Sequence, residues 1–260
     1  MRARPRLDAL LGHLPHGPAD LARQVALFSA ALYAYSLVRG FADEPGAVET
    51  AFDNARSVIG IERALNVFVE PSIQAWAMGS SLVVDAASWL YLNAQTSVTL
   101  GALLFIYLRR NESFYFVRNM LMVAMALALV GYVVFPTAPP RFLPEWGFFD
   151  SVSDFAGVPS DSATADALFN PYAAIPSMHV AYALMMGWSL ARLVRHRVAA
   201  GWWWAYPFVV TFVIVATANH FFLDAVVGAL VAGLAALTAR ELGRARPAAW
   251  AFGERQPALS

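Results

Sequence analysis

Six long runs of apolar residues constrain this chain more than any other feature of its sequence. An α-helix needs about 20 predominantly apolar residues to cross the hydrocarbon core of a membrane. The runs are Gln24 to Val38, Ala86 to Leu108, Phe114 to Phe135, Pro176 to Val194, Ala200 to Ala218 and Phe221 to Ala239. The first run is short, and the fourth carries polar residues that neighbouring helices can satisfy. We therefore predict an all-α fold, a polytopic bundle of six transmembrane helices.

The composition favours a membrane over water as the solvent. Hydrophobic residues make up 59% of the 260 residues and charged residues 14%, whereas soluble domains carry about 25% charged residues. The chain has no cysteine, which excludes disulfides, thiolate nucleophiles, cysteine-ligated zinc and iron–sulfur clusters. All 18 basic residues are arginine. Schiff-base chemistry on a lysine and a phosphate-binding lysine are therefore excluded as well.

The arginines sort to one side of the predicted six-span topology. Fourteen precede the first run, follow the sixth, or flank the connections between runs two and three and between runs four and five. The other side holds only Arg39, Arg56, Arg63 and Arg141. Because short cytoplasmic segments carry an excess of arginine, both termini are predicted to be cytoplasmic. The chain is then a multi-pass protein of the cell membrane, with the segment before His179 and that before His220 outside.

This topology divides the chain into a cytoplasmic N-terminal segment (1–23), a transmembrane domain (24–240) and a cytoplasmic tail (241–260). The domain includes an outer interfacial segment (41–85) and an outer loop (136–175).

The outer interfacial segment contains an amphipathic pattern. Between Ala47 and Glu70, apolar residues recur at near-helical spacing beside Asp53, Arg56 and Glu62. This pattern predicts one or two helices lying on the membrane surface. They would either form the floor of a site where lipids reach the protein, or serve as a connector with no part in binding. The outer loop is rich in proline and aspartate and has no such pattern.

His220 and Asp224 form the strongest candidate for a chemical site. They are four residues apart at the outer start of the sixth run, so a helix places them on one face. A carboxylate there can accept from one imidazole nitrogen and leave the other free to attack. The alternative is a histidine paired with an aspartate for solvation only. Because ionisable residues within membrane spans are costly, the functional interpretation is favoured.

His179 lies at the outer start of the fourth run, at the same predicted depth as His220. It follows Pro176 and Ser177, and proline suits the first turn of a helix, where free amides point toward an anion. His179 is thus placed to protonate a leaving oxygen. Taken alone, it is equally well explained as a lone interfacial histidine, and the nearby His220 favours the functional role.

Arg141 follows a proline-rich approach, Pro136 to Pro140, just outside the third run. Its guanidinium suits two-point binding of phosphate oxygens. An arginine that extends to lipid headgroups would give the same pattern. Further polar or aromatic residues are candidates for lining a cavity or bonding between helices: Asn93, Gln95, Tyr172 and Asn219. The spacing of the histidines and aspartates predicts no metal site and no cofactor.

Three segments together resemble a known family. Pro136-Thr-Ala-Pro-Pro-Arg141, Ala174-Ile-Pro-Ser-Met-His179 and Asn219-His-Phe-Phe-Leu-Asp224, in this order and with six spans, resemble the type-2 phosphatidic acid phosphatase superfamily. The closest likeness is to the branch of inositol-phosphorylceramide and sphingomyelin synthases.

The resemblance implies a role for each matching residue. His220 is the nucleophile that becomes phosphorylated, Asp224 orients it, and His179 protonates the leaving group. Arg141 and the region of Ser177 hold the phosphate, and no metal takes part.

Two departures from the plain phosphatases point to the synthase branch. Those enzymes begin the first motif with a lysine and carry an arginine six residues before the last histidine, where this chain has Ile214. The function predicted is transfer of a phosphoryl or phospho-headgroup unit, at the outer bilayer face, from a lipid phosphate or phospholipid to a hydroxyl of a polyol or lipid alcohol. The alternatives are a lipid or polyprenyl phosphate phosphatase that uses water, and a non-catalytic lipid-binding or transport protein. No nucleic acid partner is expected.

Overall fold

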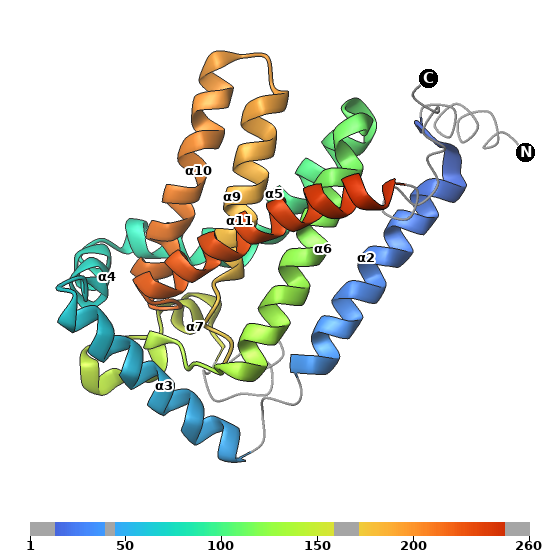
Figure 1. Ribbon diagram of the computed structural model, residues 1–260. Helices are drawn as coiled ribbons and strands as arrows, with labels where there is room; N and C mark the ends of the chain where they lie inside the picture. The colour runs from blue at the N-terminus through green and yellow to red at the C-terminus, as the bar shows by residue number, and fades with distance from the viewer. Residues whose placement is uncertain (1–13, 40–44, 159–171, 248–260) are drawn as a thin grey trace, which may run out of the picture.

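Helices account for nearly all regular structure in the part of the chain that the computed structural model describes, residues 14–39, 45–158 and 172–247. One helix coincides with each of the six predicted runs (Figure 1). They are α2 (Gly17–Arg39), α5 (Ser81–Arg109), α6 (Asn111–Val134), α9 (Met178–Leu193), α10 (Arg197–Ala216) and α11 (Phe222–Ala245).

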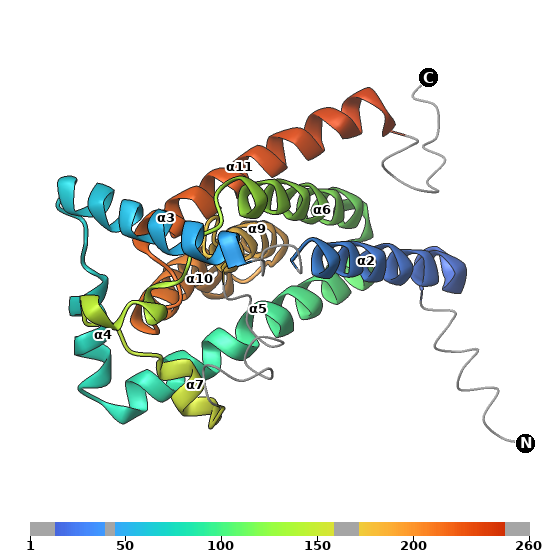
Figure 2. The same cartoon turned by 90° about the horizontal axis from the view of Figure 1, so that it is seen from below.

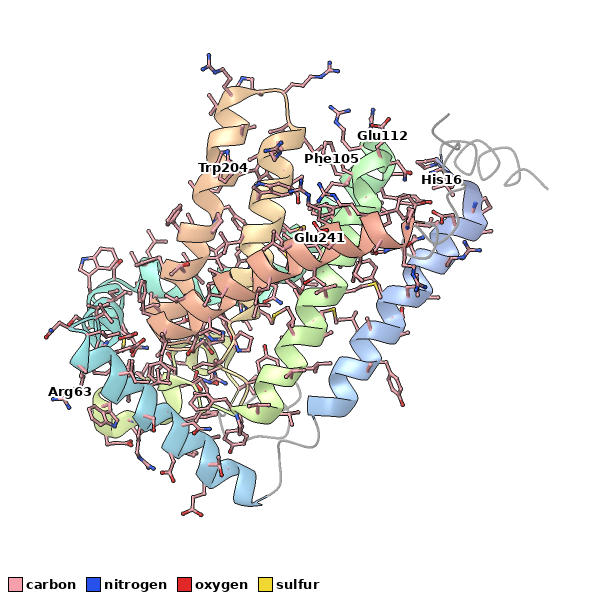
Figure 3. The ribbon with its side chains drawn as sticks, in the orientation of Figure 1. His16, Arg63, Phe105, Glu112, Trp204 and Glu241 are labelled. Carbon is pink, nitrogen blue, oxygen red and sulfur yellow. The ribbon has the colours of Figure 1, made fainter. Side chains whose placement is uncertain are left out.

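Four of these helices, α5, α6, α10 and α11, are long and apolar enough to cross a membrane. Their outer surfaces carry large apolar side chains such as Leu82, Phe208 and Leu230, each more than 60% exposed. Figure 3 shows Trp204 on the outer side of α10. An apolar surface of this extent is suited to lipid. Helix α9 has only 16 residues, about 24 Å of helix, and the crossing of the membrane by α2 and α9 stays a prediction.

Helix α9 is the centre of the bundle and packs against α5, α6, α10 and α11. Small residues allow this close packing. A Cβ on Gly187 of α9 would lie 2.6 Å from the Trp203 carbonyl oxygen of α10, so only glycine fits there. Buried methionines, including Met178 and Met186, fill the space between α9 and α6. The helix that carries His179 is therefore held on several sides.

The interfacial segment forms two helices, α3 (Pro45–Ala64) and α4 (Glu70–Met78). On α3 the buried residues follow one helical stripe: Ala51, Ala55, Val58, Ile59 and Glu62. This stripe packs on the start of the outer loop and on Phe221, and Figure 2 shows α3 lying across one end of the bundle. The prediction that this segment is helical is confirmed, and its position on the membrane surface stays a prediction. Glu62, however, was expected on the polar face and is wholly buried.

The described part of the outer loop contains three short helical segments, η2 (Pro140–Phe142), η3 (Pro144–Trp146) and α7 (Ser151–Ala156). Gln74 of α4 holds this loop by two hydrogen bonds. Its amide donates to the Phe149 carbonyl oxygen at 2.7 Å, and its own carbonyl oxygen accepts from the Phe149 amide at 3.1 Å. The interfacial helices and the loop therefore form one layer at the end of the bundle where the three motif segments lie.

Candidate active site

Backbone hydrogen bonds join the three motif segments. Thr137 accepts from the Ala174 amide at 3.1 Å, which makes an isolated parallel bridge between the first and second segments. The Arg141 amide donates to the Ala218 carbonyl oxygen at 2.8 Å, linking the first segment to the third. The Ser177 amide donates to the Asp224 carbonyl oxygen at 3.1 Å, linking the second to the third. Segments up to eighty residues apart in the sequence thus share one small volume.

His220 has its tautomer fixed by two acceptors. Its Nδ1 lies 2.9 Å from the Ala174 carbonyl oxygen and 3.2 Å from Oδ2 of Asp224. Both partners only accept, so Nδ1 must carry the hydrogen. The neutral ring then has its lone pair on Nε2, the nitrogen that can attack an electrophile. The spacing of four residues indicated the Asp224 contact, and Ala174 is a second acceptor that the spacing could not show.

Asp224 is fully buried in the first turn of α11. Its Oδ2 also accepts from the Phe221 amide at 2.9 Å, which fixes the carboxylate against the start of the helix. Among the described residues no donor reaches Oδ1. A carboxylate held in this way can stabilise a positive charge that develops on His220.

His179 lies in the first turn of α9, close to His220. The two ring centroids are 5.6 Å apart with an angle of 62° between the planes, and the Tyr91 ring of α5 stacks on the His179 ring at 4.5 Å. Ser177, wholly buried, begins the helix: its hydroxyl accepts from the Val180 amide at 3.5 Å. The sequence placed both histidines at one depth, and the structure brings their rings together.

Arg141 points into the protein. Its side chain is only 4% exposed, so it does not extend to lipid headgroups. Nη1 donates to Oδ1 of Asn219, and Nε lies 3.6 Å from Oδ2 of Asp150. Asn219 is in turn fixed by its donation to Thr217. A guanidinium is therefore held next to the residue that precedes His220.

A family model describing the PAP2 superfamily matches residues 56–238. The chain belongs to the PAP2 superfamily. The match includes all three motif segments, and the resemblance to the type-2 phosphatidic acid phosphatases is confirmed at the level of the superfamily. Comparisons with curated proteins and with solved structures gave no match.

Membership of the PAP2 superfamily supports a lipid phosphoester activity of the phosphatase or phosphotransferase type. In this PAP2 chain, the position where plain phosphatases carry an arginine is occupied by Ile214. The Ile214 side chain is wholly buried in an apolar cluster with Val180 and Ala183. Its carbonyl oxygen accepts from the amides of Asn219 and His220. Ile214, which stands in place of the arginine, is therefore part of a packed core.

Of the candidates for lining a cavity, Gln95 lines two, and Asn93 is bonded within its own helix. Gln95 lines a void of about 20 Å³ beside His179 and Tyr182, and also a larger cavity of about 220 Å³ between α2, α5, α6 and α9. The Asn93 amide donates to the Trp89 carbonyl oxygen of its own helix. The Tyr172 ring packs edge-on against Phe52 of α3 and at a tilt against Phe142 of η2.

Several residues of the PAP2 site escaped the sequence interpretation. Tyr91 stacks on His179, Asp150 faces Arg141, and Glu62 and Glu70 contact the start of α11. Glu62 stood in an amphipathic pattern that gave it a solvated face, and no pattern singled out the others. Within the described residues, no three His, Cys, Asp or Glu side chains gather as a metal site would require.

Proposed function

We propose that this protein is a membrane enzyme that cleaves a lipid phosphoester through a phosphohistidine and transfers the phosphoryl or phospho-headgroup unit to a hydroxyl acceptor. The observation that carries the proposal is the fixed tautomer of His220, with Nε2 free of hydrogen and the ring of His179 alongside. A nucleophile and a proton donor at this separation can stand on either side of a scissile P–O bond.

In the first step, Nε2 of His220 attacks phosphorus. The new P–N bond forms as the bond to the leaving oxygen breaks, and protonated His179 gives its proton to that oxygen. Asp224 and the Ala174 carbonyl oxygen stabilise the positive ring of phosphohistidine through Nδ1–H. Arg141, held by Asn219, binds the phosphate oxygens as negative charge develops.

In the second step, the acceptor hydroxyl gives its proton to His179 and attacks phosphorus. The P–N bond then breaks and His220 regains its lone pair. An alcohol acceptor makes the reaction a transfer, whereas water makes it a hydrolysis. The buried Ile214 in place of a cation supports the synthase branch, and hence the alcohol.

The larger cavity supports a lipid as the substrate. Apolar side chains dominate its wall, among them Phe28, Leu103 and Met125, and Met178 brings it next to His179 in sequence. A hydrocarbon chain in this cavity would be out of water.

The experiment compares two substrates on purified protein. His220→Ala should abolish turnover of both a lipid phosphate and an activated aryl phosphate. His179→Ala should lower the turnover rate of the lipid phosphate by about 10² to 10⁴-fold. It should lower that of the aryl phosphate little, because the phenolate leaves without a proton. His196→Ala, exposed at the start of α10, is the matched control and should behave as wild type.

Rapid alkaline quenching of wild-type protein should also show acid-labile phosphate on His220. Adding a polyol or lipid alcohol should yield a phosphorylated acceptor in place of free phosphate. Equal losses on both substrates, with no phosphoenzyme, would contradict the assigned roles. Lipid binding without any turnover by the wild type would favour a transport or binding protein.

A further inference from the structure

Three carboxylate groups meet at the start of α11. Phe221 donates its amide to Asp224, as described above. The next amide, that of Phe222, donates to Oε1 of Glu70 at 2.7 Å, and that of Leu223 donates to Oε1 of Glu62 at 2.7 Å. Three consecutive amides are therefore each bound by a different carboxyl group, and two of these groups come from the interfacial helices α3 and α4.

The capping of α11 is unusual because it is supplied from far along the chain. The N-cap residue is Phe221, whose ring is buried and cannot accept a hydrogen bond. A helix start normally uses a serine, threonine, asparagine or aspartate at that position. Here, Glu62 and Glu70 complete the helix, 161 and 152 residues away in sequence. The structure of the catalytic helix thus depends on the interfacial helices.

Glu62 and Glu70 are also buried as a pair. Their exposed fractions are 1% and 0%, and among the described residues no donor reaches the second oxygen, Oε2, of either one. Two ionised carboxylates buried side by side repel each other strongly, whereas one shared proton removes the repulsion and satisfies both oxygens. Burial, and next the negative charge of Glu70, raises the pKa of Glu62 to about 9. Glu62 is therefore the protonated member at neutral pH.

The groups around the pair act on the pKa of Glu62 in both directions. Asp224 of α11 faces Glu62 and raises its pKa further. Arg63, the next residue on α3, lies over the ring of Trp146 at 5.6 Å. The hydrogen bond from the Leu223 amide lowers the pKa of Glu62, in the opposite direction.

We propose that Glu62 and Glu70 form a proton-sharing carboxyl clamp, in which they act as positioning residues that hold the first turn of α11 and so place Asp224 and His220. The clamp rests on the proposed function of His220. It also occupies the amides of the first turn of α11, so these amides do not bind the substrate phosphate. The interfacial helices are then a structural part of the site.

The direction of the pH dependence follows from the raised pKa of Glu62. The protonated form is the one that the fold favours, so the stabilising contribution is complete below the ordinary value of 4.5 and is lost as pH rises through about 9. Above that pH, two negative carboxylates face each other beside Asp224. The hydrogen bonds from the first turn of α11 to Glu62 and Glu70 should then weaken, and His220 should no longer be held in position.

Glu62→Gln tests the proton directly. Glutamine keeps an acceptor for the Leu223 amide and offers Glu70 a permanent donor, but it cannot ionise. We expect kcat near the wild-type value at neutral pH and an alkaline limb of the pH–rate profile that moves to higher pH. Glu62→Ala removes the acceptor and should lower kcat by up to about 10²-fold with KM little changed, because the attacking geometry is misplaced. Glu49→Gln, on the exposed face of α3, is the matched control.

Hydrogen exchange provides a readout that does not need turnover. Peptides covering Asn219 to Leu230 should exchange faster in Glu62→Ala than in wild type, and at wild-type rates in Glu62→Gln and Glu49→Gln. The clamp is overturned if Glu62→Gln keeps the wild-type alkaline limb, or if exchange in Glu62→Ala is unchanged. If the wild type turns over no lipid phosphate, the proposed function fails, and the exchange measurement alone decides the clamp.

Discussion

Two buried polar clusters lie at opposite ends of the bundle, and each is built around an arginine. One, at the end that we predict to face outside and therefore call the outer cluster, contains Arg141, His220 and Asp224. The inner cluster lies where α2, α5 and α6 meet, and its centre is Arg118, which is 0% exposed. Figure 3 shows the two ends: Arg63 marks the outer one, and His16 and Glu112 mark the inner one.

The clusters differ in how their polar atoms are satisfied. Arg118 donates to Gln24 at 2.7 Å and twice to Asn119, at 3.1 and 2.8 Å. Asp20 accepts from the hydroxyls of Tyr107 and Tyr115 and from Gln24. In the outer cluster, by contrast, Oδ1 of Asp224 is buried with no donor among the described residues. A buried network whose polar atoms are all hydrogen-bonded serves to join helices. An unpaired buried oxygen beside histidine rings is instead typical of an active site.

The largest expected difference between the two ends is their accessibility from outside the cell. The cysteine-free chain allows Glu145→Cys on η3 and Glu112→Cys on α6, both exposed positions. From the arginine asymmetry, we expect a membrane-impermeant thiol reagent to label only Glu145→Cys in intact cells and both variants after permeabilisation. Labelling of Glu112→Cys alone in intact cells would invert the proposed orientation, in which both termini are cytoplasmic.

The two arginines should respond differently to the same substitution. Arg141→Lys keeps the charge but loses the planar fork, and we expect about 10² to 10³-fold lower kcat per folded molecule. Arg118→Lys loses the two-point contact with Asn119 and should cost about 1 to 3 kcal/mol of stability, with activity per folded molecule unchanged. Both are measured by steady-state kinetics and thermal unfolding in detergent. If the two substitutions lowered kcat and stability to the same extent, the assignment of one cluster to catalysis and the other to structure would be wrong.

The sequence predicted contacts between residues that are close along the chain better than contacts between residues that are far apart. The six runs and the His220–Asp224 pairing follow from the helical period, which acts over a few residues. Glu62 was placed on a polar face because the amphipathic pattern groups it with Asp53 and Arg56, which are indeed exposed and paired with each other. Its true partner is an amide about 160 residues away, which no periodicity reveals. Arg118 was likewise counted among the arginines that flank a predicted cytoplasmic connection, and no pattern showed that it is buried on α6 and bonded to Gln24 of α2.

The smallest effect concerns a glycine that lets the outer cluster assemble. Gly228 follows Asp224 by one helical turn, so the two share a face of α11. A Cβ added to Gly228 would lie 2.3 Å from the backbone oxygen of Ser177, and neither backbone can move freely, because the Ser177 amide is bonded to Asp224. Gly228→Ala should therefore displace the start of α9, and with it His179.

Gly233→Ala is the matched control, because it lies on the same helix with nothing within 4 Å of an added Cβ. Both substitutions gain about 1 kcal/mol of helix propensity, so the difference between them isolates the crowding at Ser177. We expect Gly228→Ala to lose about 1 to 3 kcal/mol relative to Gly233→Ala in thermal unfolding. Its kcat on a lipid phosphate should fall more than its kcat on an aryl phosphate, because the displaced residue is the proton donor. Equal losses on both substrates would instead place the damage at His220, and would show that α11 yields to the new methyl group while Ser177 does not.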